Sequence, residues 1–363
     1  MNGRLALLGS LLLLWVAPAV AIPLYSSREG ATCISCHIDP NGGGIRNEFG
    51  FNYAKNRHSI EEEEKWAKYT VNPQLNEWIR LGLDARFMYY ASHVEGGRTV
   101  APSTFFPMQG NLRVAISPHD QLTIVGSHGI VVDTPGFPTP YVAREIYGLI
   151  QGLPKNLYIQ AGRFRLPFGL RQDDHTSYLR SSAFLLYDSQ SEDAGVEVGS
   201  VGPNWFGQFS FTNGGPPFAE NAETVAGKVG RTSRVFQAAV SGYHRFSAPF
   251  GVTIDRWSAY ASATRGPITL IGEYGGGTTR SPAGTANTEA YFAEVDFRVA
   301  RGVNLRGKYD WLEPDEASGG DVSRIVAEVD WAPMPFTEIK LSYRGYDDAT
   351  DYNEYVAMLT LPF

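Results

Sequence analysis

Residues 303–311 read VNLRGKYDW, and this short stretch decides the fold class. Val303, Leu305, Gly307, Tyr309 and Trp311 alternate with an asparagine, an arginine, a lysine and an aspartate. A period of two puts the apolar residues on one face of an extended strand and the charged residues on the other. Such a strand separates an apolar environment from a polar one.

The same alternation recurs on both sides of this stretch, at residues 291–299, 324–331 and 338–344. From about Leu75 onward such segments follow one another every 15 to 25 residues or so, with tight turns between them, which is typical of outer-membrane barrels. A soluble antiparallel sheet with one wet face would show the same alternation, so the period alone does not separate the two.

The end of the chain favours the membrane alternative. Phe363 is the last residue, and Leu361, Leu359, Ala357 and Tyr355 precede it at alternate positions. This pattern resembles the C-terminal signal of bacterial outer-membrane barrels, whose last strand ends in an aromatic residue. We predict an all-β protein, an antiparallel β-barrel in the bacterial outer membrane, in contact with outer-membrane lipid.

About fifteen strand candidates can be counted, and bacterial barrels have even strand numbers, so we predict 16 strands, with 14 as the next choice. Long loops and short turns should alternate along the chain, but this pattern fails between Gly214 and Gly276. The candidate long extracellular loops are residues 213–232 and 276–288.

The N-terminus carries an export signal. Arg4 precedes an apolar run from Leu5 to Val16, which ends at an Ala-Val-Ala cleavage site before Ile22. The run is too short to span a bilayer, so residues 1–21 are predicted to be a signal peptide. The net charge of −7 and the pI of about 5.6 argue against nucleic acid as a partner.

Cys33, Cys36 and His37 form a C-x-x-C-H sequence and include both cysteines of the chain. In a c-type haem site each thiol adds across one haem vinyl group, and the adjacent histidine becomes the proximal iron ligand. We therefore predict one covalent haem c. A disulfide, a redox dithiol or a zinc site are the alternatives, although zinc ligands of matching spacing are missing nearby.

The second axial ligand is less well defined by the sequence. His58 is the closest candidate, ahead of a helix predicted to begin at Ser59, where Ser59 and Glu62 form a capping box. Met108 is a weaker candidate, and an open sixth position is the third possibility. We predict His37 and His58 as the metal ligands.

The surroundings of the motif suggest how the haem edge is held. Residues 39–44 contain a proline and three consecutive glycines, which excludes regular structure and lets the backbone pass close to a flat ligand. Arg46, Tyr53, Lys55 and Arg57 follow, and each is a candidate partner for the haem propionates or an ordinary surface residue.

Residues 162–171 read GRFRLPFGLR and resemble a G-[KR]-F-x-x-P-F-G stretch of phosphate-selective and related porins. The arginines of this stretch could face the lumen and bind anions. A structural turn after a strand is the simpler interpretation, and it is the one that we favour.

A haem motif joined to an outer-membrane barrel resembles the fused monohaem cytochrome–porin family, which includes outer-membrane iron oxidases. Cys33, Cys36 and His37, the downstream Phe49-Gly50 pair and the barrel closing at Phe363 carry the resemblance. It implies that residues 22–72 are a haem c segment, in or against the barrel, and that residues 73–363 are the barrel.

Electron transfer is the function that the combination indicates. One haem cannot bridge a bilayer core of about 30 Å alone, so it would have to sit inside the lumen with partners approaching from either side. We expect electrons to pass between an extracellular donor or acceptor, with iron as one candidate, and periplasmic cytochromes; whether the chain is also an enzyme, an Fe(II) oxidase, stays open. The alternatives are a diffusion porin, anion-preferring or not, whose haem segment is a plug or sensor, and a haem enzyme with an open iron site.

Overall fold

The computed structural model describes residues 23–69, 72–94, 101–129, 145–172, 174, 176–180, 184, 192–213, 222–247, 250–315, 320–347 and 352–363. The predicted signal peptide lies outside the described residues.

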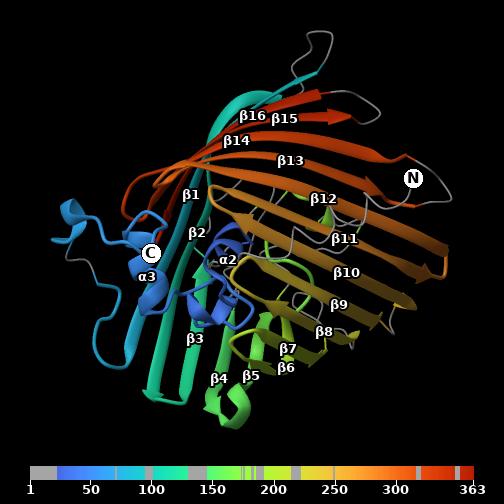
Figure 1. The fold of residues 1–363 in the computed structure, drawn as a ribbon. Helices are drawn as coiled ribbons and strands as arrows, with labels where there is room; N and C mark the ends of the chain where they lie inside the picture. The colour runs from blue at the N-terminus through green and yellow to red at the C-terminus, as the bar shows by residue number, and fades with distance from the viewer. Residues whose placement is uncertain are drawn as a thin grey trace, which may run out of the picture.

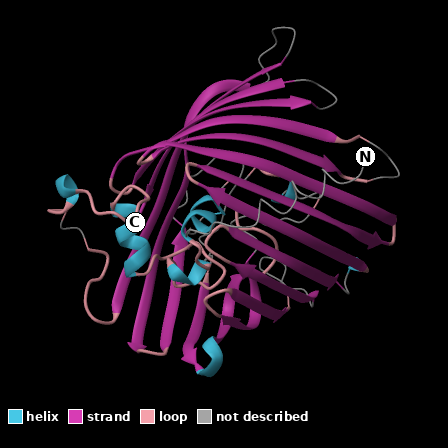
Figure 2. Cartoon of the chain, in the orientation of Figure 1, coloured by secondary structure: helices cyan, strands magenta, loops and turns pink. Residues whose placement is uncertain are grey.

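The chain forms a closed barrel of 16 antiparallel strands, in which each strand pairs with its neighbours in sequence and β1 pairs with β16 (Figures 1 and 2). This confirms the predicted fold class and strand number. The strands are β1 (Ile79–Val94), β2 (Ala101–His119), β3 (Leu122–Gly129), β4 (Ile146–Leu153), β5 (Leu157–Arg165), β6 (Glu192–Val201), β7 (Trp205–Thr212), β8 (Ala222–Thr232), β9 (Phe236–Ser247), β10 (Val252–Arg265), β11 (Ile268–Ser281), β12 (Gly284–Ala300), β13 (Val303–Glu313), β14 (Val322–Met334), β15 (Thr337–Asp347) and β16 (Tyr352–Pro362).

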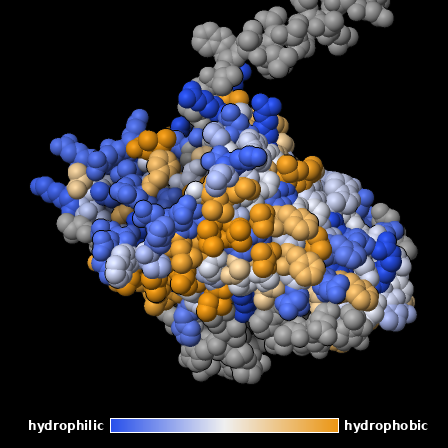
Figure 3. Space-filling view, turned by 90° about the horizontal axis from the view of Figure 1, so that it is seen from below, coloured by the Kyte–Doolittle hydropathy of each residue, from blue (hydrophilic) through white to orange (hydrophobic). Residues whose placement is uncertain are grey.

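The alternation of β13 is realised as two faces of the wall. Leu305 keeps 44% of its surface exposed on the outside, whereas Lys308 and Asp310 are buried in the interior. The same pattern on the other strands gives an apolar outer surface, visible as the orange area of Figure 3. Trp257, Tyr274 and Tyr291 contact one another in series on three neighbouring strands, as in an interfacial aromatic girdle. Among the described residues no helix is long and apolar enough to cross a membrane.

At one end of the barrel every connection between neighbouring strands is short, whereas those at the other end are mostly longer, with the two-residue connection β11–β12 as an exception. The connections β2–β3, β4–β5, β6–β7, β8–β9, β10–β11, β12–β13 and β14–β15 contain two or three residues each. The end of the barrel with these turns also holds the start of β1 and Phe363. Since short turns of outer-membrane barrels are periplasmic, we assign this end to the periplasm.

The predicted long loop at residues 276–288 was wrong, and the one at residues 213–232 was wrong in its second half. Residues 276–288 belong to β11 and β12, which continue as a regular hairpin joined by two residues, and residues 222–232 form β8. Strand pairing continues there in unbroken register, from Gly276 opposite Glu289 to Ser281 opposite Gly284, because the backbone ladder does not require apolar side chains. Residues 214–221 lie outside the described part of the chain. The region in which the predicted alternation of loops and turns failed, Gly214 to Gly276, contains the strands β8, β9, β10 and the first part of β11.

The N-terminal segment, residues 23–69, enters from the periplasmic end. It contains the helices α2 (Pro23–Glu29) and α3 (Glu48–Lys55) and the single 3-10 turns η1 (Cys33–Ser35) and η2 (Glu64–Trp66). Figure 1 shows α2 inside the ring of strands and α3 near the C-terminus. In α2, Arg28 donates hydrogen bonds to Thr269 and Asn304 of the wall, which fixes the helix in the lumen.

The helix predicted to begin at Ser59 does not form, and the real helix α3 precedes His58. Arg57 and His58 have φ angles of 55° and 59°, and the His58 N–H bonds the carbonyl of Tyr53 at 3.0 Å. This left-handed pair ends α3 and reverses the chain. The Ser59 hydroxyl accepts only the N–H of Glu61, so the predicted capping box is absent because the following residues extend away from a helical path.

Candidate functional site in the barrel lumen

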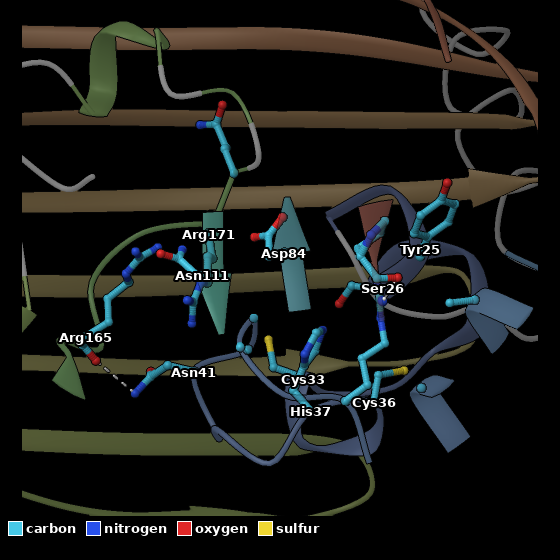
Figure 4. A pocket seen from close by; sticks show the side chains of 18 of the residues that line it. Tyr25, Ser26, Cys33, Cys36, His37, Asn41, Asp84, Asn111, Arg165 and Arg171 are labelled. Carbon is cyan, nitrogen blue, oxygen red and sulfur yellow. Dashed lines mark hydrogen bonds between the residues drawn. The ribbon is translucent and has the colours of Figure 1, made fainter. Parts of the chain in front are cut away.

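A cavity in the lumen brings the predicted haem residues together. It has a cavity volume of about 230 Å³ and is partly open to solvent. Cys33, Cys36, His37 and His58 all line it, together with residues of the barrel wall. Figure 4 shows the two cysteines and His37 on one side of this space, with Asp84, Asn111 and Arg171 facing it from elsewhere.

A tight turn positions the cysteines and His37. The N–H groups of Cys36 and His37 both donate to the carbonyl of Cys33, at 3.1 and 3.0 Å. The side chain of Asn47 caps α3 and also donates to the carbonyls of Ile34 and Ser35, at 3.0 Å each. The motif and the helix that follows it are therefore one hydrogen-bonded unit.

Gly50, of the Phe49-Gly50 pair noted in the sequence, is where α3 packs against the turn of the motif. A Cβ atom at Gly50 would lie 2.1 Å from the carbonyl oxygen of Cys36, closer than any real contact. Only glycine lets α3 pack this tightly on the motif turn.

The glycine-rich loop is irregular, as predicted, and its glycines are used for close approach. Gly42 has a φ of 85°, and a Cβ there would lie 2.9 Å from the Cβ of Cys33. Gly43 has a φ of 73°, and a Cβ there would lie 2.5 Å from the guanidinium of Arg171. The loop thus touches the motif on one side and Arg171 on the other.

His37 and His58 are both held as neutral imidazoles. Burial, and then Arg46, Arg171 and Arg113, lower the pKa of His37 to about 3, and its Nδ1 is buried without a hydrogen-bond partner among the described residues. Burial also lowers the pKa of His58 to about 4. The Tyr25 hydroxyl lies 2.5 Å from Nδ1 of His58, which leaves Nε2 as the ring nitrogen that Tyr25 does not contact. A neutral imidazole is the form that binds metals.

The two cysteines are not joined by a disulfide. Burial raises the pKa of Cys36 to about 12, with the neighbouring Cys33 adding to the effect, so both sulfurs are neutral thiols at the edge of the cavity. Among the residues that the structure describes, no group of three or more His, Cys, Asp or Glu side chains is arranged to hold a bare metal ion.

The candidate propionate partners near the motif separate into two groups. Arg46 and Tyr53 line the cavity, but Arg46 donates to the carbonyl of Pro362 at 3.0 Å and the Tyr53 hydroxyl donates to Glu29 at 3.1 Å. Lys55 and Arg57 do not line it and pair with Glu62 and Glu63 instead. Met108, the weaker ligand candidate, does not line it either.

The stretch 162–171 is more than the turn that we favoured from sequence. Its first residues complete β5, and the rest of it leaves the wall and folds into the lumen. There the N–H of Gly169 donates to Ser241 at 2.9 Å and the N–H of Leu170 to Glu273 at 3.1 Å, on strands β9 and β11. Arg171 pairs with Asp39 at 3.3 Å and with Glu145 at 3.8 Å. This inserted segment therefore joins the haem-motif loop to the wall.

A buried ionic clamp fixes the continuation of the inserted segment. Arg324 on β14 is fully buried and contacts Asp310 at 2.5 Å and Asp174 at 2.7 Å. Lys308 reaches the same two carboxylates at 3.0 and 3.2 Å. The charges of the lumen wall, which the alternation predicted in general, are thus used to hold chain inside the barrel.

Sequence reasoning missed the wall residues that face the motif, Asp84 on β1 and Asn111 and Arg113 on β2. The period of two could have assigned them to the lumen face. Nothing in the local pattern says which height of the lumen wall the motif occupies, so their proximity to Cys33 and His37 could not be read from the sequence.

Comparison with known proteins finds the fold and no family. No protein-family model matches the sequence, and no curated protein is similar to it. Among solved structures, OmpT of Vibrio cholerae is 11% identical, with a TM-score of 0.60, over 78% of this chain and 97% of that one. An anion-selective porin from Comamonas acidovorans is 10% identical, with a TM-score of 0.60, over 78% and 99%. Salmonella typhi OmpF, solved with daunomycin, is 11% identical, with a TM-score of 0.59, over 78% and 97%.

These neighbours are outer-membrane porins, and their similarity to this chain concerns the barrel. Together with the apolar outer belt they identify a porin-like barrel of the bacterial outer membrane, in contact with its lipid.

Proposed function

We propose that this protein carries one covalent haem c inside a porin-like barrel and passes electrons through it across the outer membrane. One observation carries the proposal: Cys33, Cys36, His37 and His58, chosen from sequence, line a single cavity in the lumen. In the same proposal residues 22–72 are the haem segment, residues 73–363 are the barrel and residues 1–21 are removed.

The residues fit such a group. Cys33 and Cys36 present free thiols, and each would add its sulfur to one vinyl carbon and its hydrogen to the other, so that no oxidant is needed. His37 supplies a neutral imidazole, and His58 offers a second one. When bound, haem c supplies a one-electron Fe(III)/Fe(II) couple.

The protein's own residues place and shield that couple. The segment enters from the periplasmic end, which puts the motif within reach of periplasmic cytochromes. The inserted segment and its Arg324 clamp occupy the lumen on the other side. The outer partner in this proposal is an extracellular donor or acceptor, with iron as the first candidate.

The second candidate function is a diffusion porin whose haem segment is a plug or sensor. The structural neighbours favour it more directly than electron transfer, since all are porins and one is anion-selective. In that case the arginine-rich lumen would select the solute, and the haem would not pass electrons between partners.

Proteoliposomes separate the two functions. Vesicles holding a reduced, membrane-impermeant viologen and purified protein are mixed with ferric citrate outside. Electron transfer predicts oxidation of the trapped viologen, with one electron passed per Fe(III) reduced, and its loss in a Cys33→Ala/Cys36→Ala variant. Entry of small sugars into the vesicles without viologen oxidation would instead establish the porin.

The role of His58 is tested by absorption spectroscopy. His58→Ala should convert a six-coordinate, low-spin haem into a form that binds carbon monoxide when reduced. His119→Ala, at an exposed histidine beside the β2–β3 turn, is the control and should change nothing. A low-spin spectrum unchanged in His58→Ala would eliminate His58 as a ligand.

A further inference from the structure

The haem segment cannot satisfy both carboxylates of a haem with its own cations. Of the three basic residues between His37 and His58, Lys55 and Arg57 pair with glutamates away from the cavity. Arg46 is the one that lines the cavity, and one of its terminal nitrogens is bonded to Pro362 at the end of the barrel. Partners for the propionates must therefore come largely from the wall.

The inner face of β2 offers two groups that are not fully used. Asn111 is only 1% exposed and lines the cavity, and its amide Nδ2 is the donor that it can offer to a carboxylate. Arg113, two residues on and on the same face, makes long ion pairs with the described residues, 3.8 Å to Asp84 and 3.7 Å to Glu145. Its Nε is buried without a hydrogen bond. A buried donor left in this state is costly unless a ligand completes it.

The carboxylates nearby are already occupied. Asp84, directly across the ladder from Asn111, accepts hydrogen bonds from Gln109 at 2.9 Å and from Arg86 at 3.4 Å. Glu145 lies between Arg113 and Arg171. These acids hold the arginines in place without neutralising the cavity.

The charge of the cavity suits a dianion. Among the described residues, seven basic side chains line it, against four carboxylates: Arg46, Arg86, Arg113, Arg165, Arg171, Arg180 and Lys228, against Asp84, Glu145, Glu192 and Glu338. The surplus of positive charge lies in a site that is largely removed from water, where it attracts anions more strongly than it would on a surface.

The location of these residues relative to the cysteines also fits the shape of a haem. The two propionates of a haem lie on the edge of the ring opposite the vinyl-derived carbons that the cysteines hold. Figure 4 shows Asn111 and Arg171 on one side of the view and Cys36 on the other, with Cys33 and His37 between them.

We propose that Asn111 and Arg113 of β2, with Arg171 of the inserted segment, form the carboxylate-binding site for the haem propionates. This inference rests on the proposed haem function. It makes the barrel wall, and not the haem segment alone, the part of the protein that holds the charged edge of the ring and sets its potential.

The test uses full-length protein in detergent, with Asn111→Leu and Arg113→Gln as the variants. Resonance Raman spectra should show shifted propionate bending bands in both, because each variant removes a hydrogen bond to a carboxylate. Arg113→Gln should also raise the ratio of oxidised to reduced haem about tenfold at a fixed solution potential, a shift of about 59 mV for one electron. Arg113→Lys keeps the charge and should restore a ratio of oxidised to reduced haem close to that of the wild-type protein.

The controls keep the outcomes distinct. Arg280→Gln removes an exposed arginine on the outer face of β11 and should leave both readouts unchanged. Unmoved propionate bands in Asn111→Leu and Arg113→Gln, with full covalent haem, would overturn the inference alone. Absence of covalent haem from the wild-type protein would overturn the proposed function instead.

Discussion

The barrel wall and the segment inside it are specified in different ways. The wall repeats one rule, an apolar residue outward and a polar residue inward, over 16 strands, and each strand restates it. The N-terminal segment has no period. Its conformation depends on single residues: a glycine against a carbonyl at Gly50, a left-handed pair at Arg57 and His58, and an asparagine cap at Asn47.

This difference has a physical consequence. A wall residue can be replaced by another of the same polarity with little effect, because its neighbours repeat the signal. A segment residue acts through one contact, which no other residue supplies. Changes in the segment should therefore remove function while leaving the barrel intact, and changes in the clamp should release the chain from the wall.

The largest expected effect is the loss of haem from Cys33→Ala/Cys36→Ala. The two sulfurs are the only thiols of the chain, so covalent haem should fall to zero. The barrel should still fold, because its strands do not depend on the motif. Haem staining of a denaturing gel measures the first effect and heat-modifiable migration measures the second. Haem stain that persisted after denaturation would show that attachment uses other residues.

The next largest effect is expected for Arg324→Met. Removing one partner of a buried ion pair costs about 3–5 kcal/mol, and among the described residues Asp174 and Asp310 would keep Lys308 as their one shared cationic partner. The inserted segment should detach and become cleavable by protease in intact outer membranes.

Arg280→Met is the matched control for the clamp. Arg280 also pairs with an aspartate, Asp255, but its side chain is 57% exposed, so its loss should cost only about 0–1 kcal/mol. Equal protease resistance of both variants would contradict the clamp.

A smaller effect is expected for Gly43→Ala. An alanine there would adopt a left-handed conformation, at a cost of about 1–3 kcal/mol, and would also press on Arg171. Gly266→Ala has the same backbone strain at a φ of 60°, yet a Cβ there meets nothing within 4 Å. The melting temperature of the haem absorbance should fall more for Gly43→Ala. The same fall in both would mean that the contact with Arg171 has no effect.

The wall could be predicted from sequence and the lumen could not. The alternation at residues 303–311 and the terminal Phe363 indicated an outer-membrane barrel, and the count of about fifteen strand candidates together with the even-number rule gave 16 strands. The threonine-rich and glycine-rich hairpin at residues 276–288 was taken for a loop because its strands have weak apolar faces. Such a hairpin extends beyond the lipid, where an apolar outer face is not needed.

The lumen depends on contacts between residues far apart in sequence. The capping box at Ser59 was a sound local signal, but the reversal at Arg57 and His58 overrode it. The pairs Arg171–Asp39 and Arg324–Asp174 join segments more than 100 residues apart, so no local spacing in the sequence predicts them. The haem motif itself is the exception, since its five residues are contiguous.

The most direct test of the account is an absorption spectrum of the purified outer-membrane protein before and after dithionite, combined with a haem stain under denaturing conditions. We predict one covalent haem per chain, low-spin in the oxidised state, with a reversible c-type band on reduction. A protein without covalent haem, or with a haem that denaturation removes, would contradict the account and leave a porin with a cysteine-bearing plug.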